Sequence, residues 1–316
     1  MMGKAPASLY KYLSFSDRMV EQLYHGKVFY ADPGTFNDPL DCRPVVIAGD
    51  QSIERLKLLL KLMVIRRVEK ESSAALKRLK LKGQKLDLHR ARLGETEVQD
   101  AIRGIEYMAT DPEITDQAGY YQRELLTLIQ SEVKDTLATG VLCLSANATS
   151  PLMWSHYGQQ HRGVCIEYDT SDLKSTRIHK VVYGQSREIL ADSILRWLQD
   201  GDVQSQLEVE RASLLTKSGE WRYEKEWRLL APIGLDRSPF PVKSVTFGMN
   251  CPSAIFESTM SMLGGEKSTI KFWKITEPTS NFKLKRARIH FDDSMRPMLD
   301  QDYSWLLDDL DDAHDV

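Results

Sequence analysis

The sequence lacks the signals of several common protein classes. No run of about 18 or more apolar residues occurs in its 316 residues, so no segment is long enough to span a bilayer as a helix. The four cysteines lie far apart and form no C-x-x-C pair, which argues against a zinc ribbon and a disulfide framework. The first residues show no apolar core of signal-peptide length. We therefore expect a cytoplasmic protein with reduced cysteines and no membrane partner.

Common catalytic signatures are missing as well. The sequence contains no P-loop, no G-x-G-x-x-G dinucleotide fingerprint, no G-x-S-x-G elbow and no H-E-x-x-H motif. Of the seven histidines, only His156 and His161 lie close together, so we predict no metal site. The net charge of −3 and the 42% of hydrophobic residues are typical of a globular protein and say nothing about its chemistry.

The character of the sequence changes at three places, which predicts four segments. Residues 1–50 combine short strand-like runs with turn formers, and residues 51–140 repeat apolar side chains at helical spacing. Strand-like runs return in residues 141–295, and residues 296–316 form an acidic tail. We predict an α+β fold in which a mixed, mostly antiparallel β core is interrupted by a helical insertion or cap.

The predicted helical insertion is rich in cations. Between Arg55 and Arg92 there are thirteen Lys or Arg residues and three acidic residues. Such a stretch either forms a solvated helical face or binds an anion such as a nucleic acid through salt-dependent phosphate contacts. The candidate contacts are Arg66, Arg67, Lys77 and Arg78. A protein partner is left open.

Two motifs near the start of the chain combine polar and aromatic residues. In the strand-like run Leu-Tyr-Lys-Tyr-Leu, alternation places Tyr10 and Tyr12 on one face and Lys11 on the other. Lys11 is either an exposed lysine of an edge strand or a point charge for a phosphate or carboxylate. Asn37, in a Phe-Asn-Asp-Pro motif, either closes a turn through its own side chain or points into a cleft.

A third motif, Met-Trp-Ser-His-Tyr, follows Pro151. If Pro151 begins a helix, Trp154 and Tyr157 share one face and His161 lies four residues further along it. Such a face either belongs to the core or stacks on a flat ring, with His156 as a hydrogen-bonding neighbour.

A fourth motif contains two carboxylates. In a strand that begins near Tyr223, the side chains of Glu224, Glu226 and Arg228 share one face. Two like charges at that spacing raise the pKa of one carboxyl unless Arg228 or a ligand hydroxyl compensates. The motif is either a surface strand with an ion pair or part of a site.

Taken in order, these motifs resemble the bacterial family named domain of unknown function 2971 (DUF2971). The resemblance runs from about residue 9 to about residue 248 and includes Glu167. Residues 51–139 and the acidic tail carry no motif of that family. The family name implies no settled activity.

A second resemblance implies a mechanism. The tripeptide Glu224-Lys225-Glu226 is similar to the E-x-E motif of ADP-ribosyltransferases, which bind NAD between two small sheets without a Rossmann fold. The resemblance implies that Glu226 binds the ribose and stabilises an oxocarbenium ion, while Glu224 orients the acceptor. The middle Ser-Thr-Ser signature of these enzymes is missing, and Ser145 is the nearest candidate for its place. The usual Arg or His of the first strand is replaced by Lys11.

This resemblance also implies the substrate contacts. Lys11 would contact the pyrophosphate of NAD, and Tyr157 or Trp154 would stack on nicotinamide. The predicted binding residues are Lys11, Tyr12, Asn37, Ser145, Trp154, His156, Tyr157 and Arg228. The sequence thus predicts an ADP-ribosyltransferase-like enzyme with NAD as its substrate, in a phage-defence or toxin setting. The alternative is a non-catalytic module that binds a nucleotide or nucleic acid.

Overall fold

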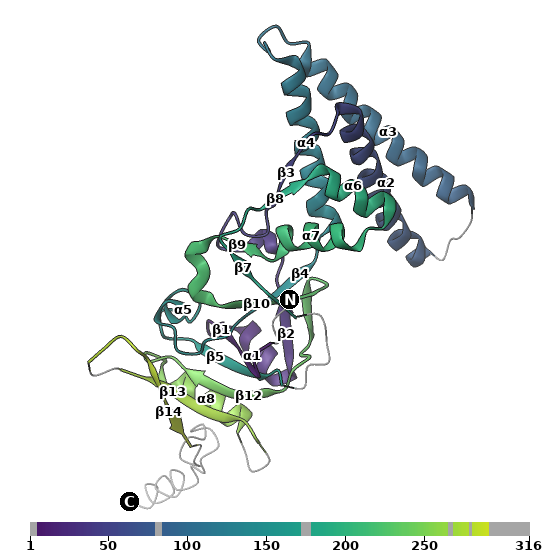
Figure 1. Ribbon diagram of the computed structural model, residues 1–316. Coiled ribbons are helices and arrows are strands. Elements are labelled where there is room, and N and C mark those ends of the chain that lie inside the picture. Colours follow the sequence, from purple (N-terminus) through teal and green to yellow (C-terminus); the bar gives the residue numbers. More distant parts are fainter. Residues whose placement is uncertain (1–4, 80–83, 172–177, 265–267, 278–279, 291–316) are drawn as a thin grey trace, which may run out of the picture. The chain divides into compact units, whose positions relative to one another are not determined.

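The chain folds into two compact units in a computed structural model (Figure 1). It describes residues 5–79, 84–171, 178–264, 268–277 and 280–290, without the side chains of residues 73–79 and 84–91. The first unit consists of Met1–Ala31, Val141–Lys180 and Arg222–Val316, and the second of Asp32–Gly140 and Val181–Trp221. The predicted acidic tail, residues 296–316, lies outside the described residues.

An eight-stranded sheet forms the centre of the first unit. Its strands, in spatial order, are β14 (Lys285–Ile289), β13 (Lys271–Thr276), β12 (Val242–Phe247), β5 (Val164–Asp169), β1 (Ser8–Leu13), β4 (Gly140–Ser145), β10 (Glu226–Ala231) and β6 (Ile178–Lys180). Strands β12 and β13 are parallel, whereas β1 runs antiparallel to both β4 and β5. A separate antiparallel pair joins β2 (Lys27–Tyr30) to β11 (Gly234–Arg237). The predicted α+β class with a mixed, mostly antiparallel core is confirmed.

One face of this sheet packs against two helices. Helix α1 (Asp17–His25) begins after Ser16, whose side chain caps it, and ends at Gly26, which adopts the left-handed conformation that glycine tolerates. Helix α8 (Ser253–Leu263) and the short helix α5 (Pro151–His156) complete the unit. Side chains of β1, β5 and β10 join Met19 of α1 and Met260 of α8 in one apolar core. This arrangement buries alternate residues of each strand and turns the others to the opposite face.

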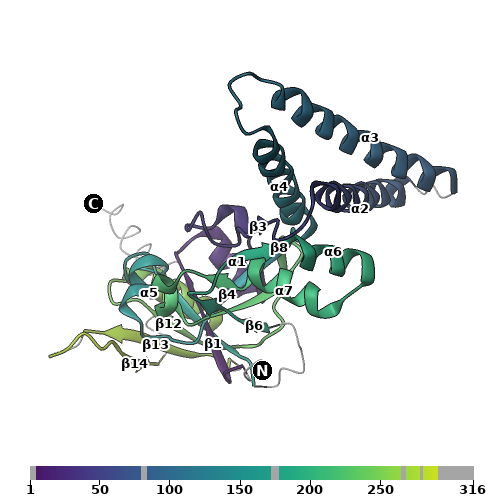
Figure 2. The same ribbon diagram turned by 45° about the horizontal axis from the view of Figure 1, so that its top comes forward.

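The second unit is mainly helical and larger than the insertion predicted at residues 51–140. Its helices are α2 (Ile53–Leu79), α3 (Gln84–Ala109), α4 (Gln117–Thr136), α6 (Ala191–Asp200) and α7 (Val203–Leu214). Two short parallel pairs join β3 (Val45–Ile47) to β8 (Glu188–Leu190) and β7 (Val182–Tyr183) to β9 (Thr216–Lys217). The long helices α2, α3 and α4 pack together (Figure 2) and share their core with α6 and α7. Residues 181–221 therefore complete the helical unit.

The basic stretch of α2 is partly used inside the second unit. Arg67 donates through Nε to both carboxylate oxygens of Glu132, at 3.2 and 3.0 Å, and also bonds to Glu97. The guanidinium of Arg66 lies 5.6 Å from the ring centroid of Trp197. These contacts give both arginines a structural role. The side chains of Lys77 and Arg78 lie outside the described residues, so a nucleic-acid partner at these helices stays a prediction.

Among the described residues, none of the helices combines the length and the apolar content that crossing a bilayer requires.

A turn after α5 places two glycines against neighbouring backbone. The carbonyl of Gly163 accepts a hydrogen bond from the amide of Gly248 at 2.9 Å. A Cβ atom at Gly163 would lie 2.2 Å from the carbonyl oxygen of Leu13, and one at Gly248 would lie 2.1 Å from that of His161. Since backbone cannot move aside as a flexible side chain can, both sites require glycine.

We predict that Gly163→Ala lowers the free energy of unfolding by about 1–3 kcal/mol, because the added methyl group overpacks the turn. Chemical denaturation with a circular-dichroism readout measures this change. Gly104→Ala is the matched control: nothing lies within 4 Å of its added Cβ, and alanine in a helix is favoured over glycine by about 0.5–1 kcal/mol. A denaturation midpoint for Gly163→Ala equal to that of the wild type would contradict the close approach of Gly163 to the Leu13 carbonyl.

Candidate functional site

The candidate site lies on the face of the eight-stranded sheet that is turned away from the apolar core. Trp227 and Leu229 of β10 belong to that core, so Glu226 and Arg228 point to the opposite side. We call this side the polar face. Its residues, by strand alternation and pairing, include Ser8, Tyr10, Tyr12, Cys143, Ser145, Cys165, Glu167, Glu226, Arg228, Ser244, Thr246 and Arg286.

Glu226 and Arg228 form a buried, bidentate ion pair. The guanidinium donates from Nε to Oε1 at 2.7 Å and from Nη2 to Oε2 at 3.0 Å. Only 4% of Glu226 and 0% of Arg228 is exposed to solvent. The Cys143 thiol lies close by: its burial raises its pKa well above the usual value, and the charge of Glu226 raises it further. A charge pair with this geometry fixes the orientation of the carboxylate.

Glu224 does not lie on the strand that the sequence predicts. A 3₁₀ helix covers Gly219–Glu224, Lys225 has a φ of 48°, and β10 begins only at Glu226. The left-handed residue interrupts strand alternation, so the predicted same-face arrangement of Glu224 and Glu226 is wrong. Main-chain contacts with β4 hold this irregular segment, since the amide of Ala146 donates to the carbonyl of Lys225 at 3.1 Å.

Glu224 is nevertheless buried beside other predicted site residues. Its carboxylate accepts a hydrogen bond from the hydroxyl of Tyr157 at 2.6 Å, and only 3% of the residue is exposed. Its backbone carbonyl accepts a hydrogen bond from Ser145 Oγ at 2.6 Å. The structure therefore brings Ser145, Tyr157 and Glu224 together at the end of β10, next to the ion pair of Glu226.

Two of the predicted binding residues belong to the scaffold. Trp154 is completely buried, and its indole Nε1 donates to the carbonyl of Ala148 at 3.0 Å. Tyr12 packs edge-on against Trp154, with ring centroids 5.2 Å apart, and donates its hydroxyl to the carbonyl of Asn147. Burial raises the pKa of Tyr12. Because Trp154 has no exposed surface, the predicted stacking of its ring on nicotinamide is wrong.

The predicted helix that carries Trp154, Tyr157 and His161 on one face is shorter than expected. Helix α5 ends at His156, and Gln159, Gln160 and His161 all have positive φ angles. This left-handed turn brings the His161 ring back over Trp154, with centroids 6.1 Å apart. His161 therefore packs on the scaffold through a turn and not along a helix.

An aromatic pair that sequence reasoning missed is more accessible. The rings of His156 and Tyr223 stack with centroids 6.1 Å apart and an interplanar angle of 29°. His156 is exposed and Tyr223 is half-buried. Tyr223 directly precedes Glu224, so this pair lies next to the end of the 3₁₀ helix that carries the buried carboxylate. The sequence feature that could have indicated this pair is Tyr223, the aromatic residue directly before the tripeptide Glu224-Lys225-Glu226.

Lys11 does not join this group. Lys11 lies on the same face of β1 as Leu9 of the apolar core, and its Nζ donates to the carbonyl of Cys143 at 3.1 Å. It is therefore on the opposite side of the sheet from Glu226. Asn37 is an exposed residue of the second unit, and its predicted role stays a prediction.

The second unit has a buried ion pair of its own. Lys217 lies 3.2 Å from Asp41, and both side chains are almost completely buried. The ammonium group of Lys217 also lies 5.1 Å from the ring centroid of Trp221. Neither residue was among the site residues predicted from the sequence: Lys217 precedes the two carboxylates of the fourth motif, and Asp41 follows the Asn-Asp-Pro turn by two residues. Within the described residues, no cluster of three or more His, Cys, Asp or Glu could hold a metal ion.

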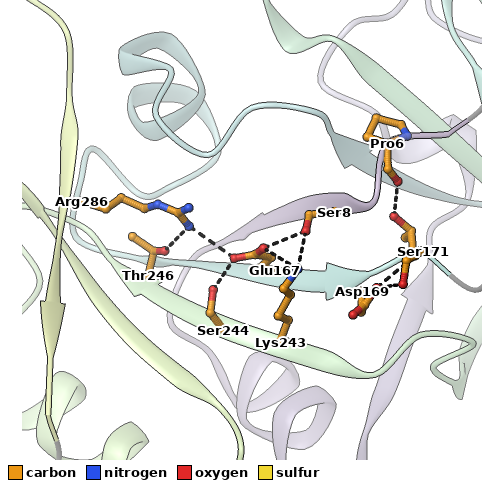
Figure 3. A network of polar contacts seen from close by, with 10 residues as sticks. Pro6, Ser8, Glu167, Asp169, Ser171, Lys243, Ser244, Thr246 and Arg286 are labelled. Carbon is orange, nitrogen blue, oxygen red and sulfur yellow. Dashed lines mark hydrogen bonds and ion pairs between the residues drawn. The ribbon is translucent and has the colours of Figure 1, made fainter.

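A second carboxylate, Glu167, organises another part of the polar face (Figure 3). It accepts hydrogen bonds from Ser8 at 2.8 Å and from Ser244 at 2.6 Å, and Arg286 lies 3.5 Å away. Burial acts to raise the pKa of Glu167, but these hydrogen bonds and the charges of Arg286 and Lys243 lower it below its usual value. The sequence marked Glu167 only as part of the family pattern, because its partners come from three other strands.

Comparison with known proteins adds a family match for part of the chain. Residues 153–229 match the model of a family described as "Protein of unknown function (DUF2971)". The matched segment includes His156, Tyr157, Lys217, Glu224 and Arg228, so the resemblance predicted from the motifs is confirmed there. No curated protein and no solved structure matches the chain.

We predict a large energetic coupling between Glu226 and Arg228. Replacing either residue alone with Met leaves a buried charge without this partner and lowers the free energy of unfolding by about 3–5 kcal/mol. The double variant Glu226→Met/Arg228→Met removes both charges, so its loss should be much smaller than the sum of the single losses. Denaturant unfolding of all four proteins gives the coupling energy.

The exposed pair Lys61–Glu95, with an N···O distance of 2.7 Å, is the control for this cycle. Its coupling should not exceed about 1 kcal/mol, because water screens both charges. An equally small coupling for Glu226 and Arg228 would contradict the burial of their ion pair.

We predict that Ser244→Ala destabilises the protein in a pH-dependent way. Because the folded-state pKa of Glu167 is lowered, its stabilising effect is present above the unfolded value of about 4.5 and is lost as the pH falls through the folded value. Loss of the Ser244 hydrogen bond raises the folded pKa. The deficit in unfolding free energy should therefore be largest near neutral pH and shrink below about pH 4.

Unfolding curves at several pH values measure this effect. Ser155→Ala is the control, because Ser155 Oγ donates to the backbone carbonyl of Pro151 and not to a titrating group. Its deficit should be the same at each pH. A pH-independent deficit for Ser244→Ala would show that the hydrogen bond does not hold the charge of Glu167.

Proposed function

We propose that this chain, whose residues 153–229 match DUF2971, is an ADP-ribosyltransferase-like enzyme that breaks the bond between nicotinamide and ribose in NAD. One observation carries the proposal: two buried glutamates two residues apart have different partners. Glu226 is held by the guanidinium of Arg228, and Glu224 by the hydroxyl of Tyr157. Because the two carboxylates have different environments, they can take different roles in one reaction.

The chemistry requires a fixed negative charge. When the glycosidic bond breaks, nicotinamide leaves with the bonding electron pair and positive charge develops on the ribose. A carboxylate that is already oriented stabilises this charge without reorganisation. Arg228 keeps Glu226 in one orientation, and each carboxylate oxygen can accept more than one hydrogen bond. A ribose hydroxyl is the donor that we assign to Glu226.

Glu224 has the second task. We assign to it the orientation of the nucleophile, which is water or an acceptor group on a macromolecule. The new bond forms at the ribose carbon that nicotinamide leaves, and the nucleophile loses a proton. Tyr157 fixes the side chain of Glu224 through the 2.6 Å hydrogen bond, which supports a positioning role for Tyr157.

The aromatic pair His156 and Tyr223 takes the stacking role that the resemblance to ADP-ribosyltransferases implies for Tyr157 or Trp154. Stacking on a flat ring requires an accessible aromatic face, and His156 is exposed whereas Trp154 is buried. We propose that nicotinamide stacks against this pair.

The proposal also includes a cellular setting. All four cysteines are free thiols, as in proteins of a reducing compartment. We propose a cytoplasmic enzyme that acts in phage defence or as a toxin.

The test is nicotinamide release from NAD, measured by mass spectrometry with water, nucleic acid or cell lysate as the source of acceptor. Glu226→Gln and Glu224→Gln should each lower the rate about 10²- to 10³-fold, because each removes a charge that acts at the reacting bond. Glu224→Gln is the cleaner variant, since a glutamine amide oxygen can still accept the Tyr157 hydrogen bond.

Glu257→Gln, a change at an exposed residue of α8, is the matched control and should keep full activity. Thermal unfolding of each variant separates loss of chemistry from loss of folding. Wild-type activity in folded Glu226→Gln, or a wild-type protein that releases no nicotinamide with any acceptor source, would overturn the proposal.

A further inference from the structure

The hairpin at one edge of the eight-stranded sheet carries a concentration of positive charge. Residues 271–290 include six Lys or Arg residues and one acidic residue, Glu277, although the whole chain has a net charge of −3. The cations are Lys271, Lys274, Lys283, Lys285, Arg286 and Arg288, all of them exposed except for the half-buried Arg286. The strands of this hairpin are β13 and β14, and β14 is the last strand of the sheet.

An aromatic ring lies among these cations. Trp273 of β13 is directly opposite Arg288 of β14, and Arg286 is opposite Ile275, so all three long side chains share the polar face. The guanidinium carbon of Arg286 lies 5.3 Å from the Trp273 ring centroid, and that of Arg288 lies 5.6 Å from it. Two arginines therefore flank one half-buried indole ring.

Contacts with the sheet fix the position of this group. Arg286 lies 3.5 Å from the Glu167 carboxylate and 3.4 Å from Thr246 Oγ1 (Figure 3). Its guanidinium carbon also lies 5.7 Å from the ring centroid of Tyr10. Lys243 contacts the same carboxylate at 3.8 Å, so two cations share one negative charge. Arg286, Arg288 and Lys243 carry three positive charges, whereas Glu167 carries one negative charge. This group therefore keeps a net positive charge in a fixed position.

We propose that the β13–β14 hairpin binds single-stranded nucleic acid. Lys and Arg residues along the strands contact phosphates. Bases stack on the exposed guanidinium plane of Arg288, which packs against the Trp273 ring, and on Phe282, which is 94% exposed in the connection between the strands. Proteins that bind single strands combine a cationic track with aromatic platforms in this way.

This chemistry distinguishes nucleic acid from other anionic partners. An anionic membrane surface would bind the cations, but one exposed phenylalanine gives little apolar area for insertion into the membrane. An acidic protein would bind the cations, but it would offer no base to stack on the guanidinium groups that pack against the Trp273 ring. The inference does not rest on the proposed NAD chemistry, because the hairpin shares no residue with the glutamate pair.

Fluorescence anisotropy with labelled 20-nucleotide oligo-dT and oligo-U, at several salt concentrations, tests the proposal on the full chain. Lys271→Glu/Arg288→Glu changes two exposed cations on the face of Trp273. It should weaken binding about tenfold or more and reduce the salt slope by about 1.4, since single strands contribute roughly 0.7 per phosphate contact. Trp273→Leu should weaken binding by about tenfold with little change in the salt slope, because it removes the ring that supports Arg288 and no charge.

Arg103→Glu/Lys134→Glu, outside the basic stretch of residues 55–92, is the matched control. It makes the same change in charge at two exposed residues of the helical unit and should leave the affinity unchanged. All variants should keep the wild-type rate of nicotinamide release in the absence of nucleic acid, so this test and that of the proposed function can fail separately.

Three results would overturn the inference: no binding by the wild type, equal losses in both double variants, or hairpin-dependent binding to vesicles of anionic lipid without binding to oligonucleotides.

Discussion

The need to pair charges buried on one face of a sheet constrains the first unit most strongly. Removing the partner of a charge that is buried in this way lowers the free energy of unfolding by about 3–5 kcal/mol. Arg228 meets this need through Glu226, and Arg286 through Glu167. A slip of one residue in β10 or β5 would turn these carboxylates into the apolar core. The ion pairs therefore fix strand register as well as local structure.

The two carboxylates are separated along the polar face. Glu226 is on β10 and Glu167 is on β5, with β4 and β1 between them, so roughly 14 Å of sheet separates the strands at about 4.8 Å for each spacing. Glu226 lies beside Glu224 and Tyr157, where a reacting bond is proposed to bind. Glu167 lies beside the cationic hairpin. One sheet face thus offers a place for chemistry and, independently, a surface for a polyanion.

Unusual backbone conformations gather in the segment that matches DUF2971. Five non-glycine residues have positive φ among the described residues, and four of them lie within residues 153–229. Lys225 turns the chain between Glu224 and Glu226, and the run of three at Gln159–His161 folds the chain back onto Trp154. Such conformations persist where surrounding contacts enforce them, and they are common at functional sites. Here the contacts are main-chain hydrogen bonds from Ala146, just after β4, to Lys225, and from Asn250, shortly after β12, to His161.

The sequence by itself determined the α+β class and named Ser145, Tyr157, Glu224, Glu226 and Arg228 among the site candidates. Local spacing and capping are short-range properties, so they can be read from neighbouring residues. Only the tertiary structure decided that Glu224 ends a 3₁₀ helix, that Trp154 is buried, and that Lys11 faces the apolar core. It also decided the partners of Glu167, which come from β1, β12 and β14. These features depend on which distant strands lie side by side, and no local pattern contains that information.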